Sequence, residues 1–220
     1  MLQNWEWLTF LHWKYDPAAI QGMLPPGLTV DTFDGSAWIG LVPFVITELR
    51  VPKTPCIPWL SKFAETNVRT YVRGPDGEPG VWFFTLEAAR LPAVSAARAS
   101  FGLPYHWARM RVKPGVTRVI YSSRRYFSAT HCNLRVSIGD PIPTGDLAQF
   151  FTARFRLYAQ RFNRLVFADI EHEPWPLQTA QIADLDENLL AACGLRVEGA
   201  PLAHYARIVH TRVGRPALAR

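Results

Sequence analysis

The sequence is poor in the residues that mark several common protein classes. Its three cysteines, Cys56, Cys132 and Cys193, are odd in number, far apart and without a CxxC pair. This pattern argues against both a disulfide framework and a thiolate zinc site, and indicates reduced thiols in the cytoplasm. No stretch offers 18 uncharged apolar residues, so we expect no membrane-spanning helix and no membrane partner.

Several motifs for bound groups and nucleophiles are missing as well. The six histidines show neither HxH nor HExxH spacing, no glycine-rich phosphate loop is present, and no G-x-S-x-G stretch occurs. We therefore expect no metal ion and no cofactor. The first 16 residues have no basic region, and Glu6, His12 and Lys14 interrupt their apolar run, which is unlike a secretory signal peptide.

Lysine is scarce, and arginine carries the positive charge. The net charge is +6 and the pI is near 9.5, yet the only lysines are Lys14, Lys53, Lys62 and Lys113. The basic residues are scattered, and no helix-turn-helix, zinc-finger or RNA-binding signature accompanies them. We therefore expect small anionic ligands rather than nucleic acid.

What the sequence has in quantity is apolar and aromatic material, 49% and 13% of its residues. This suits a folded core, and no repeat, low-complexity tract or linker divides residues 1–220, so a single domain is predicted. Apolar periodicity and turn residues predict strands at 5–13, 28–33, 37–49, 65–72, 82–87, 108–113, 117–127, 132–138, 165–173 and 203–213. They predict helices at 18–24, 93–101, 146–160 and 186–193. The strands at 28–33 and 37–49 are expected to form a hairpin.

Strands that follow strands, with a few inserted helices, indicate an α+β fold. We expect a mostly antiparallel sheet curled into a β-barrel around its aromatic side chains. A doubly wound parallel sheet fits poorly, because consecutive strands are not separated by helices.

Polar side chains are concentrated in two neighbouring strands of the stretch from residue 64 to 106. Period-two alternation places Glu65, Asn67 and Arg69 on one face of the first strand. In the second strand, Glu87 shares a face with Phe83 and Thr85. We expect these polar groups to meet in one cavity inside an apolar shell, together with Arg98 from the following helix.

Each of these residues has a catalytic and a structural interpretation. Two carboxylates in an apolar pocket would raise at least one pKa and supply a general acid or base. Alternatively, Glu65 pairs with Arg69, and Glu87 pairs with Arg90 or Arg98, as structural ion pairs.

The helix at 93–101 and the turn after it offer three further candidates. Arg98 either satisfies backbone carbonyls or presents its planar fork to a carboxylate or phosphate. Tyr105 and His106 follow at the turn fixed by Pro104, where they can exchange protons or serve a structural purpose.

Several blocks along the chain, taken together, resemble the YqjF-like family of uncharacterised bacterial proteins. They are PPGL (25–28), DGSAWIGLVPF (34–44), ETNVRTYV (65–72), GVWFFTLEA (80–88), FGLPY (101–105), FRLYA (155–159) and HEPWPL (172–177). This family is grouped with the acetoacetate decarboxylase-like superfamily. The resemblance implies a cone-shaped, mostly antiparallel barrel with an internal ligand cavity.

The same resemblance locates a difference in chemistry. In acetoacetate decarboxylases a lysine forms a Schiff base, and a second lysine beside it lowers its pKa; both lie in a Tyr-Pro-Lys-Lys stretch after Gly-Arg-Glu. Residues 97–99 (Ala-Arg-Ala) and 103–106 (Leu-Pro-Tyr-His) look like the matching places here. Tyr105 and His106 stand where the lysines would be, so no imine chemistry is expected.

These observations lead to one functional hypothesis and its alternatives. We expect a barrel that binds a small organic anion or carbonyl compound and acts on it by acid–base chemistry, without a Schiff-base lysine or a metal. The predicted catalytic residues are Glu65, Glu87, Tyr105 and His106, and the predicted ligand-binding residues are Asn67, Arg69 and Arg98. The alternatives are a non-catalytic small-ligand binder and, less favoured, an interaction protein that uses its aromatic N-terminus. A homo-oligomer is left open.

Overall fold

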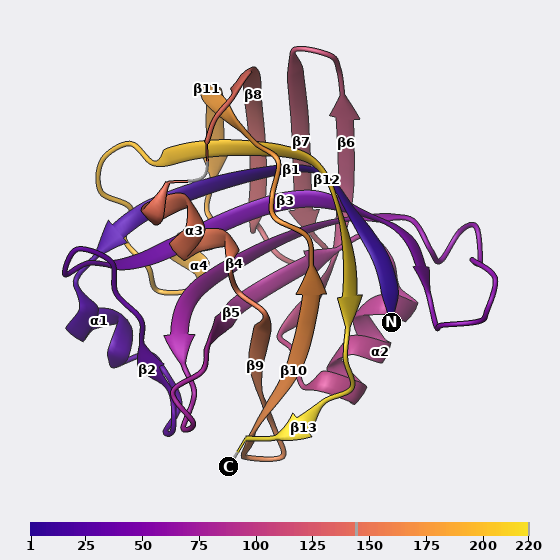
Figure 1. The fold of residues 1–220 in the computed structure, drawn as a ribbon. Coiled ribbons are helices and arrows are strands. Elements are labelled where there is room, and N and C mark those ends of the chain that lie inside the picture. Colours follow the sequence, from indigo (N-terminus) through magenta and orange to yellow (C-terminus); the bar gives the residue numbers. More distant parts are fainter. Residues whose placement is uncertain (144, 220) are drawn as a thin grey trace.

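The computed structural model describes residues 1–143 and 145–219, shown in Figure 1. The strands of this part are β1 (Leu2–Tyr15), β2 (Thr29–Val30), β3 (Ala37–Arg50), β4 (Phe63–Arg73), β5 (Pro79–Ala88), β6 (Tyr105–Pro114), β7 (Arg118–Arg125), β8 (His131–Pro141), β9 (Arg156–Arg161), β10 (Arg164–His172), β11 (Leu177–Glu187), β12 (Leu202–Val213) and β13 (Ala217–Leu218). The helices are α1 (Pro17–Gln21), α2 (Leu91–Phe101), α3 (Asp146–Thr152) and α4 (Leu189–Ala192). No helix of the described part is long and apolar enough to cross a membrane.

All the strands belong to one sheet that closes on itself twice. Its order is β13-β10-β9-β5-β6-β7-β8-β11-β12-β1-β3-β4-β2, and two additional pairings, β5 with β4 and β10 with β12, join strands that are distant in this order. The result is two rings that share β12, β1, β3, β4 and β5. Among the described pairings, only those of β5 with β6 and with β9 are parallel. The predicted mostly antiparallel sheet with a few short helices is confirmed.

The shared strands are buried on both faces because each ring has its own core. On β4, Val68 packs with Leu11 and Tyr121 in the ring that contains β7 and β8. Tyr71, on the other face of β4, packs with Phe83 in the ring that contains β9 and β10. This is why the shared strands have near-continuous apolar runs rather than a clean alternation with polar residues.

Two predicted elements are wrong in extent. The helix expected at 146–160 ends at Thr152, and the chain continues as β9, whose consecutive residues Leu157, Tyr158 and Ala159 are all buried between β5 and β10. The helix expected at 186–193 is reduced to α4, and residues 177–187 before it form β11. β11 lacks a strong apolar signal because most of its side chains are at least partly exposed.

The predicted hairpin of residues 28–33 with 37–49 is also wrong. β2 pairs with β4 instead of β3, and only the single bridge between Phe33 and Ser36 closes the turn. Local turn chemistry favoured pairing along the chain, whereas the sheet uses β4 as the partner of both β2 and β3.

Helix α2 connects β5 to β6 and lies at the open end of the ring that contains β9 and β10. In Figure 1 it is beside the N-terminus. It ends at Gly102, which has a φ of 74°. A Cβ atom at this position would lie 2.4 Å from the backbone oxygen of Gln160 in β9. Glycine therefore allows both the left-handed end of the helix and its close approach to β9, and this sets where Tyr105 enters β6.

Candidate functional site

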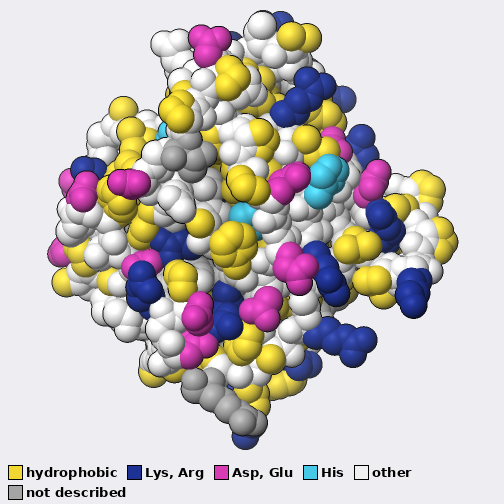
Figure 2. Space-filling view, viewed as in Figure 1, with side chains coloured by type: hydrophobic (Ala, Val, Ile, Leu, Met, Phe, Trp, Pro, Cys, Tyr) yellow, Lys and Arg dark blue, Asp and Glu magenta, His cyan; other side chains and the backbone are white. Residues whose placement is uncertain are grey.

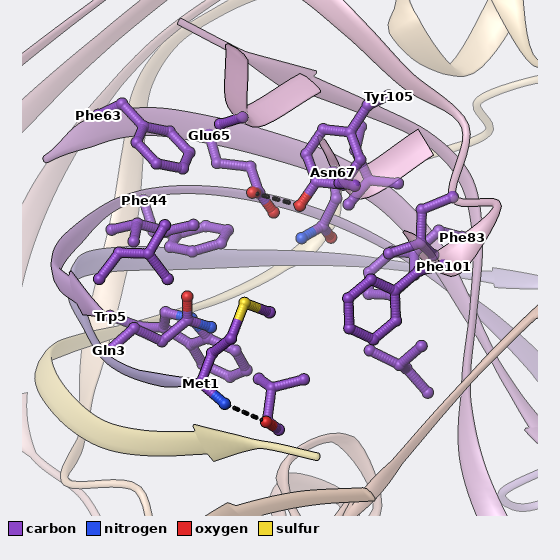
Figure 3. Close-up of a pocket in the computed structure, with 18 of the residues that line it drawn as sticks. Met1, Gln3, Trp5, Phe44, Phe63, Glu65, Asn67, Phe83, Phe101 and Tyr105 are labelled. Atoms are coloured by element: carbon purple, nitrogen blue, oxygen red, sulfur yellow. Dashed lines mark hydrogen bonds between the residues drawn. The ribbon is translucent and has the colours of Figure 1, made fainter. Parts of the chain in front are cut away.

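The ring built from β4, β5, β9, β10, β12, β1 and β3 contains a pocket of about 180 Å³, with α2 along one side. Figure 3 shows side chains from several of these elements pointing into it. Its aromatic lining consists of Trp5, Phe44, Phe63, Phe83, Phe101 and Tyr105. An engineered protein cavity of roughly 150 Å³ holds benzene, so this pocket suits a small organic molecule.

One strand supplies the main polar wall of the pocket. Glu65, Asn67 and Arg69 of β4 alternate toward it and are at most 9% exposed. Their common face follows from the period of an extended strand, in which every second side chain points the same way. The sequence-based prediction that these three side chains share one cavity is confirmed in its geometry, while their functional roles stay predictions.

Glu65 and Tyr105 form the central contact of the site. The Tyr105 hydroxyl donates a hydrogen bond to Oε2 of Glu65 at 2.7 Å, drawn as a dashed line in Figure 3. Burial raises the pKa of Glu65 to about 7, although hydrogen bonds from Tyr105 and Asn67 act in the opposite direction. Burial and the neighbouring carboxylate raise the pKa of Tyr105 well above its usual value. Near neutral pH, Glu65 can therefore gain or lose a proton while Tyr105 remains a donor.

Asn67 and Arg69 keep unused hydrogen-bonding capacity in the pocket. Oδ1 of Asn67 and Nε of Arg69 are buried and have no hydrogen-bond partner among the described residues. The Arg69 guanidinium lies 5.4 Å from the centre of the Phe10 ring, and no carboxylate within the described chain forms an ion pair with it. A buried cation without a counter-charge is costly, so this arrangement is complementary to an anion.

His12, which the sequence analysis did not name as a site candidate, lies near Arg69 in the same ring but does not line the pocket. Its Nε2 lies 2.6 Å from the Tyr71 hydroxyl, and its ring stacks on Phe151 at 3.7 Å between centroids. Burial and the nearby Arg69 hold the pKa of His12 well below its usual value, so the ring is neutral. Tyr71 is two residues beyond Arg69 on β4 and so shares its face, but the contact with His12 depends on how β1 packs in the ring.

Glu87 does not face this pocket, so the prediction that it joins Glu65 there is wrong. In the β4–β5 ladder Val68 pairs with Thr85 but Arg69 pairs with Phe83, which leaves Phe84 as an extra residue in a bulge. The bulge reverses the alternation, so that Phe83 faces the pocket while Glu87 projects into the other ring.

In that other ring Glu87 forms an ion pair that neither sequence interpretation included. Nε of Arg125 donates to its Oε1 at 3.1 Å, and Nη2 donates to the same atom at 2.5 Å. Burial raises the pKa of Glu87, and the contact with Arg125 opposes this rise. Glu65 likewise has no ion pair with Arg69 among the described residues, and its partner is Tyr105.

His106 and Arg98 lie outside the pocket as well. His106 follows Tyr105 on β6 and therefore points to the opposite face, in register with Glu87; burial and the charge of Arg125 lower its pKa. Arg98 is exposed, because the pocket-facing side of α2 carries Ala93, Ala96, Ala97, Ser100 and Phe101. At about 100° per residue, these five positions share one side of the helix and Arg98 lies on another.

No lysine and no group of metal-ligating side chains lines the pocket in the described chain. Across residues 1–143 and 145–219, no three His, Cys, Asp or Glu side chains are grouped as a metal site would require. The polar groups of the lining residues include the carboxylate of Glu65, the phenol of Tyr105, the amides of Gln3 and Asn67, the hydroxyl of Ser100, the guanidinium of Arg69 and the amino group of Met1, which donates to the backbone oxygen of Val213.

The amino-acid sequence matches a known protein family and a relative within the curated proteins. Residues 2–210 match the family model DUF2071, described as "Uncharacterized conserved protein". The chain is 38% identical over 213 residues to "Uncharacterized protein YqjF" of Bacillus subtilis, an alignment that covers 94% of this chain and 87% of the relative.

Solved structures extend the comparison to the fold. An acetoacetate decarboxylase-like enzyme from Sphingomonas wittichii superimposes with a TM-score of 0.73 at 15% identity, over 100% of this chain and 92% of the other. The acetoacetate decarboxylase of Legionella pneumophila gives 0.70 at 12% identity, over 100% and 88%. The enduracididine biosynthesis enzyme MppR, in its complex with pyruvate, gives 0.71 at 13% identity, over 99% and 89%. At these identities the similarity shows a common fold.

Proposed function

This chain belongs to the DUF2071 family and has the acetoacetate decarboxylase-like fold, and from the chemistry of its pocket we propose that it binds a small organic monoanion and exchanges a proton with it through Glu65. The observation that carries the proposal is the Glu65–Tyr105 contact of 2.7 Å inside a mostly aromatic pocket. A carboxyl group with a pKa of about 7 is matched to proton transfer at neutral pH.

Arg69 supports the anionic character of the ligand. Its buried guanidinium has an unpartnered Nε and no acidic partner in the described chain. A bound carboxylate would use this donor and balance the charge. Pyruvate, with which MppR is complexed, is an anion of this kind bound to a protein of the same fold.

Tyr105 has the geometry to assist the proton transfer. A phenol beside the carboxyl group of Glu65 can redirect its hydrogen bond to a carbonyl or carboxylate oxygen of the ligand. Glu65 then takes a proton from the ligand as a carboxylate, or gives one as a carboxylic acid. The pocket volume of about 180 Å³ limits the ligand to on the order of ten non-hydrogen atoms, judged against the cavity of roughly 150 Å³ that holds benzene.

The proposal can be tested with benzoate as a probe of matched size and charge and benzyl alcohol as its uncharged control. Native mass spectrometry of the purified protein is run in parallel to find a co-purified acid. Benzoate should bind more tightly than benzyl alcohol, and Arg69→Met should remove that difference. Equal binding of the two probes, or an unchanged preference in Arg69→Met, would contradict the proposal for an anion.

Tyr105→Phe separates proton transfer from binding once an acid has been found. Loss of the donor should slow exchange of the ligand's acidic C–H with solvent deuterium by about a hundredfold, since one such donor in an enzyme is worth about 3 kcal/mol in the transition state. A neutral hydrogen bond contributes only about 1 kcal/mol to affinity. If Tyr105→Phe lost only this much affinity and the unsubstituted protein catalysed no measurable exchange, the protein would bind the ligand without the proposed proton transfer.

A further inference from the structure

A second concave site lies on the sheet formed by β6, β7 and β8. Its lining residues are mostly charged and polar, unlike those of the aromatic pocket described above. It is a groove of about 840 Å³ on the exposed face of these strands. Arg109 and Arg111 of β6 and Arg124 of β7 line it, with His131, Asn133 and Asp186 at its other side. In Figure 1 these strands rise above the level of the shared strands, and Figure 2 shows dark blue basic side chains on the upper part of the molecule.

The three arginines place like charges next to one another. Arg109 and Arg124 are directly opposite in the β6–β7 ladder, and Arg111 is two positions along β6 from Arg109. All three are exposed, and within the described residues none of them forms an ion pair. Like charges directly opposite each other destabilise a sheet, so folding alone does not account for this pair.

The acidic residue in the groove forms no ion pair with the arginines. The carboxylate of Asp186 accepts from Nδ2 of Asn133 at 3.2 Å and lies 3.0 Å from Nε2 of His131. Its contacts are therefore with side chains of β8. Among the described residues, the three guanidinium groups have no carboxylate within ion-pair distance.

Protection of a sheet edge explains only part of the cluster. Beyond Trp107, β6 is hydrogen-bonded only to β7 in the described chain, and charged residues on such an edge oppose pairing with another molecule. Arg124, however, lies on β7, which has β6 on one side and β8 on the other. An arginine on a strand flanked on both sides has no edge to protect, so its position opposite Arg109 requires another reason.

We propose that this groove binds a small ligand carrying more than one phosphate group. Planar guanidinium forks match phosphate oxygens, and two of them on facing positions can hold one phosphate group from both sides. Arg111, roughly 7 Å further along β6 by strand geometry, reaches a second phosphate group. The volume of about 840 Å³ falls in the range of sites for single small molecules, about 300–1,000 Å³, which favours such a ligand over a polymer.

This site is independent of the proton-transfer pocket, since the two share no lining residue. The experiment is isothermal titration of the full chain with inorganic tripolyphosphate at low and near-physiological salt. Arg124→Ser and Arg109→Ser test the facing pair. Arg135→Ser is the matched control, because Arg135 lies on β8 of the same sheet, is exposed and does not line the groove.

Tripolyphosphate should bind to the unsubstituted protein, and each groove variant should lose about tenfold or more in affinity, as expected for hydrogen bonds to a charged group. Arg135→Ser should bind nearly as tightly as the unsubstituted protein, and so should Glu65→Gln, which alters only the pocket. No binding of tripolyphosphate, or an equal loss in Arg135→Ser, would overturn the proposal. It would also be overturned by a single-stranded oligonucleotide or an anionic lipid vesicle that binds to the face and is not displaced by tripolyphosphate.

Discussion

At the scale of single residues, consecutive inward positions of β4 hold three polar groups that differ in their need for a partner. Glu65 has its partner in Tyr105, whereas buried atoms of Asn67 and Arg69 have none among the described residues. Buried polar atoms are almost always hydrogen-bonded in folded proteins. Both residues line the pocket, so we infer that these atoms are available to a bound ligand and that they lower the stability of the protein without one.

Arg69→Met tests this inference directly. Methionine retains much of the apolar stem of arginine but removes a buried charge that has no counter-ion, so the free energy of unfolding should be unchanged or increase by about 1 kcal/mol. Chemical denaturation without benzoate measures the stability of the protein alone, and denaturation with benzoate measures the stabilisation by the probe. The variant should lose this stabilisation. Destabilisation of several kcal/mol without any probe present would show that Arg69 is a structural residue.

At the scale of elements, the bulge at Phe84 in β5 divides the two acidic residues between two interiors. Glu65 faces the pocket beside Tyr105, while Glu87 faces the other ring beside Arg125. A shift of one residue in a strand exchanges the faces of all the side chains beyond it. One extra residue therefore changes Glu87 from a candidate in the pocket to the partner of an arginine from β7.

Glu87→Ala should accordingly affect stability and leave the pocket unchanged. Glu87 is 1% exposed, and removing one member of a buried ion pair typically costs about 3 kcal/mol or more because the other charge is left unpaired. Urea denaturation should report this loss, and the double variant Glu87→Leu with Arg125→Met should recover most of it. Benzoate affinity should not change in the double variant; a large decrease would return Glu87 to the binding site.

At the scale of the whole molecule, the pocket couples global stability to pH. The pKa of Glu65 is raised from 4.5 to about 7 by folding, so the folded state holds a proton that the unfolded state releases. The contribution of this proton to the free energy of unfolding is fully present below about pH 4.5 and is lost as the pH rises through about 7. The shift corresponds to about 3 kcal/mol. His12 acts in the opposite direction, since its lowered pKa favours the folded state above the ordinary pKa of histidine, 6.5.

The difference between the unsubstituted protein and Glu65→Gln isolates the contribution of Glu65 from that of His12. Glutamine mimics the protonated carboxyl group at every pH. The two proteins should therefore differ least in stability near pH 5, and the variant should gain up to about 3 kcal/mol relative to the unsubstituted protein by pH 8. Thermal or urea denaturation across this range provides the measurement. A difference that does not vary with pH would mean that Glu65 ionises near its ordinary pKa.

The sequence by itself determined the class of fold and one wall of the pocket. Period-two alternation depends only on local backbone geometry, so it assigned Glu65, Asn67 and Arg69 to one face before any strand pairing was known. Turn residues and apolar runs located most strands. The helix predicted at 18–24 overlaps α1, whose start is a local feature: Oδ1 of Asp16 accepts from the Ala18 amide. The order of strands predicted a closed, mostly antiparallel sheet, the family blocks agreed with it, and the structure has one.

Tertiary structure alone decided which faces meet. Whether Glu87 joins Glu65 depends on a bulge in the β4–β5 ladder, and whether Arg98 faces inward depends on how α2 is rotated against the ring. The partners of Tyr105, His12 and Arg124 come from other strands, most of them distant in the sequence. Long-range pairing is set by the burial of all the strands together, because each ring must enclose its own core. No local pattern carries that information, so the sequence could indicate the polar residues but not the two interiors between which the fold divides them.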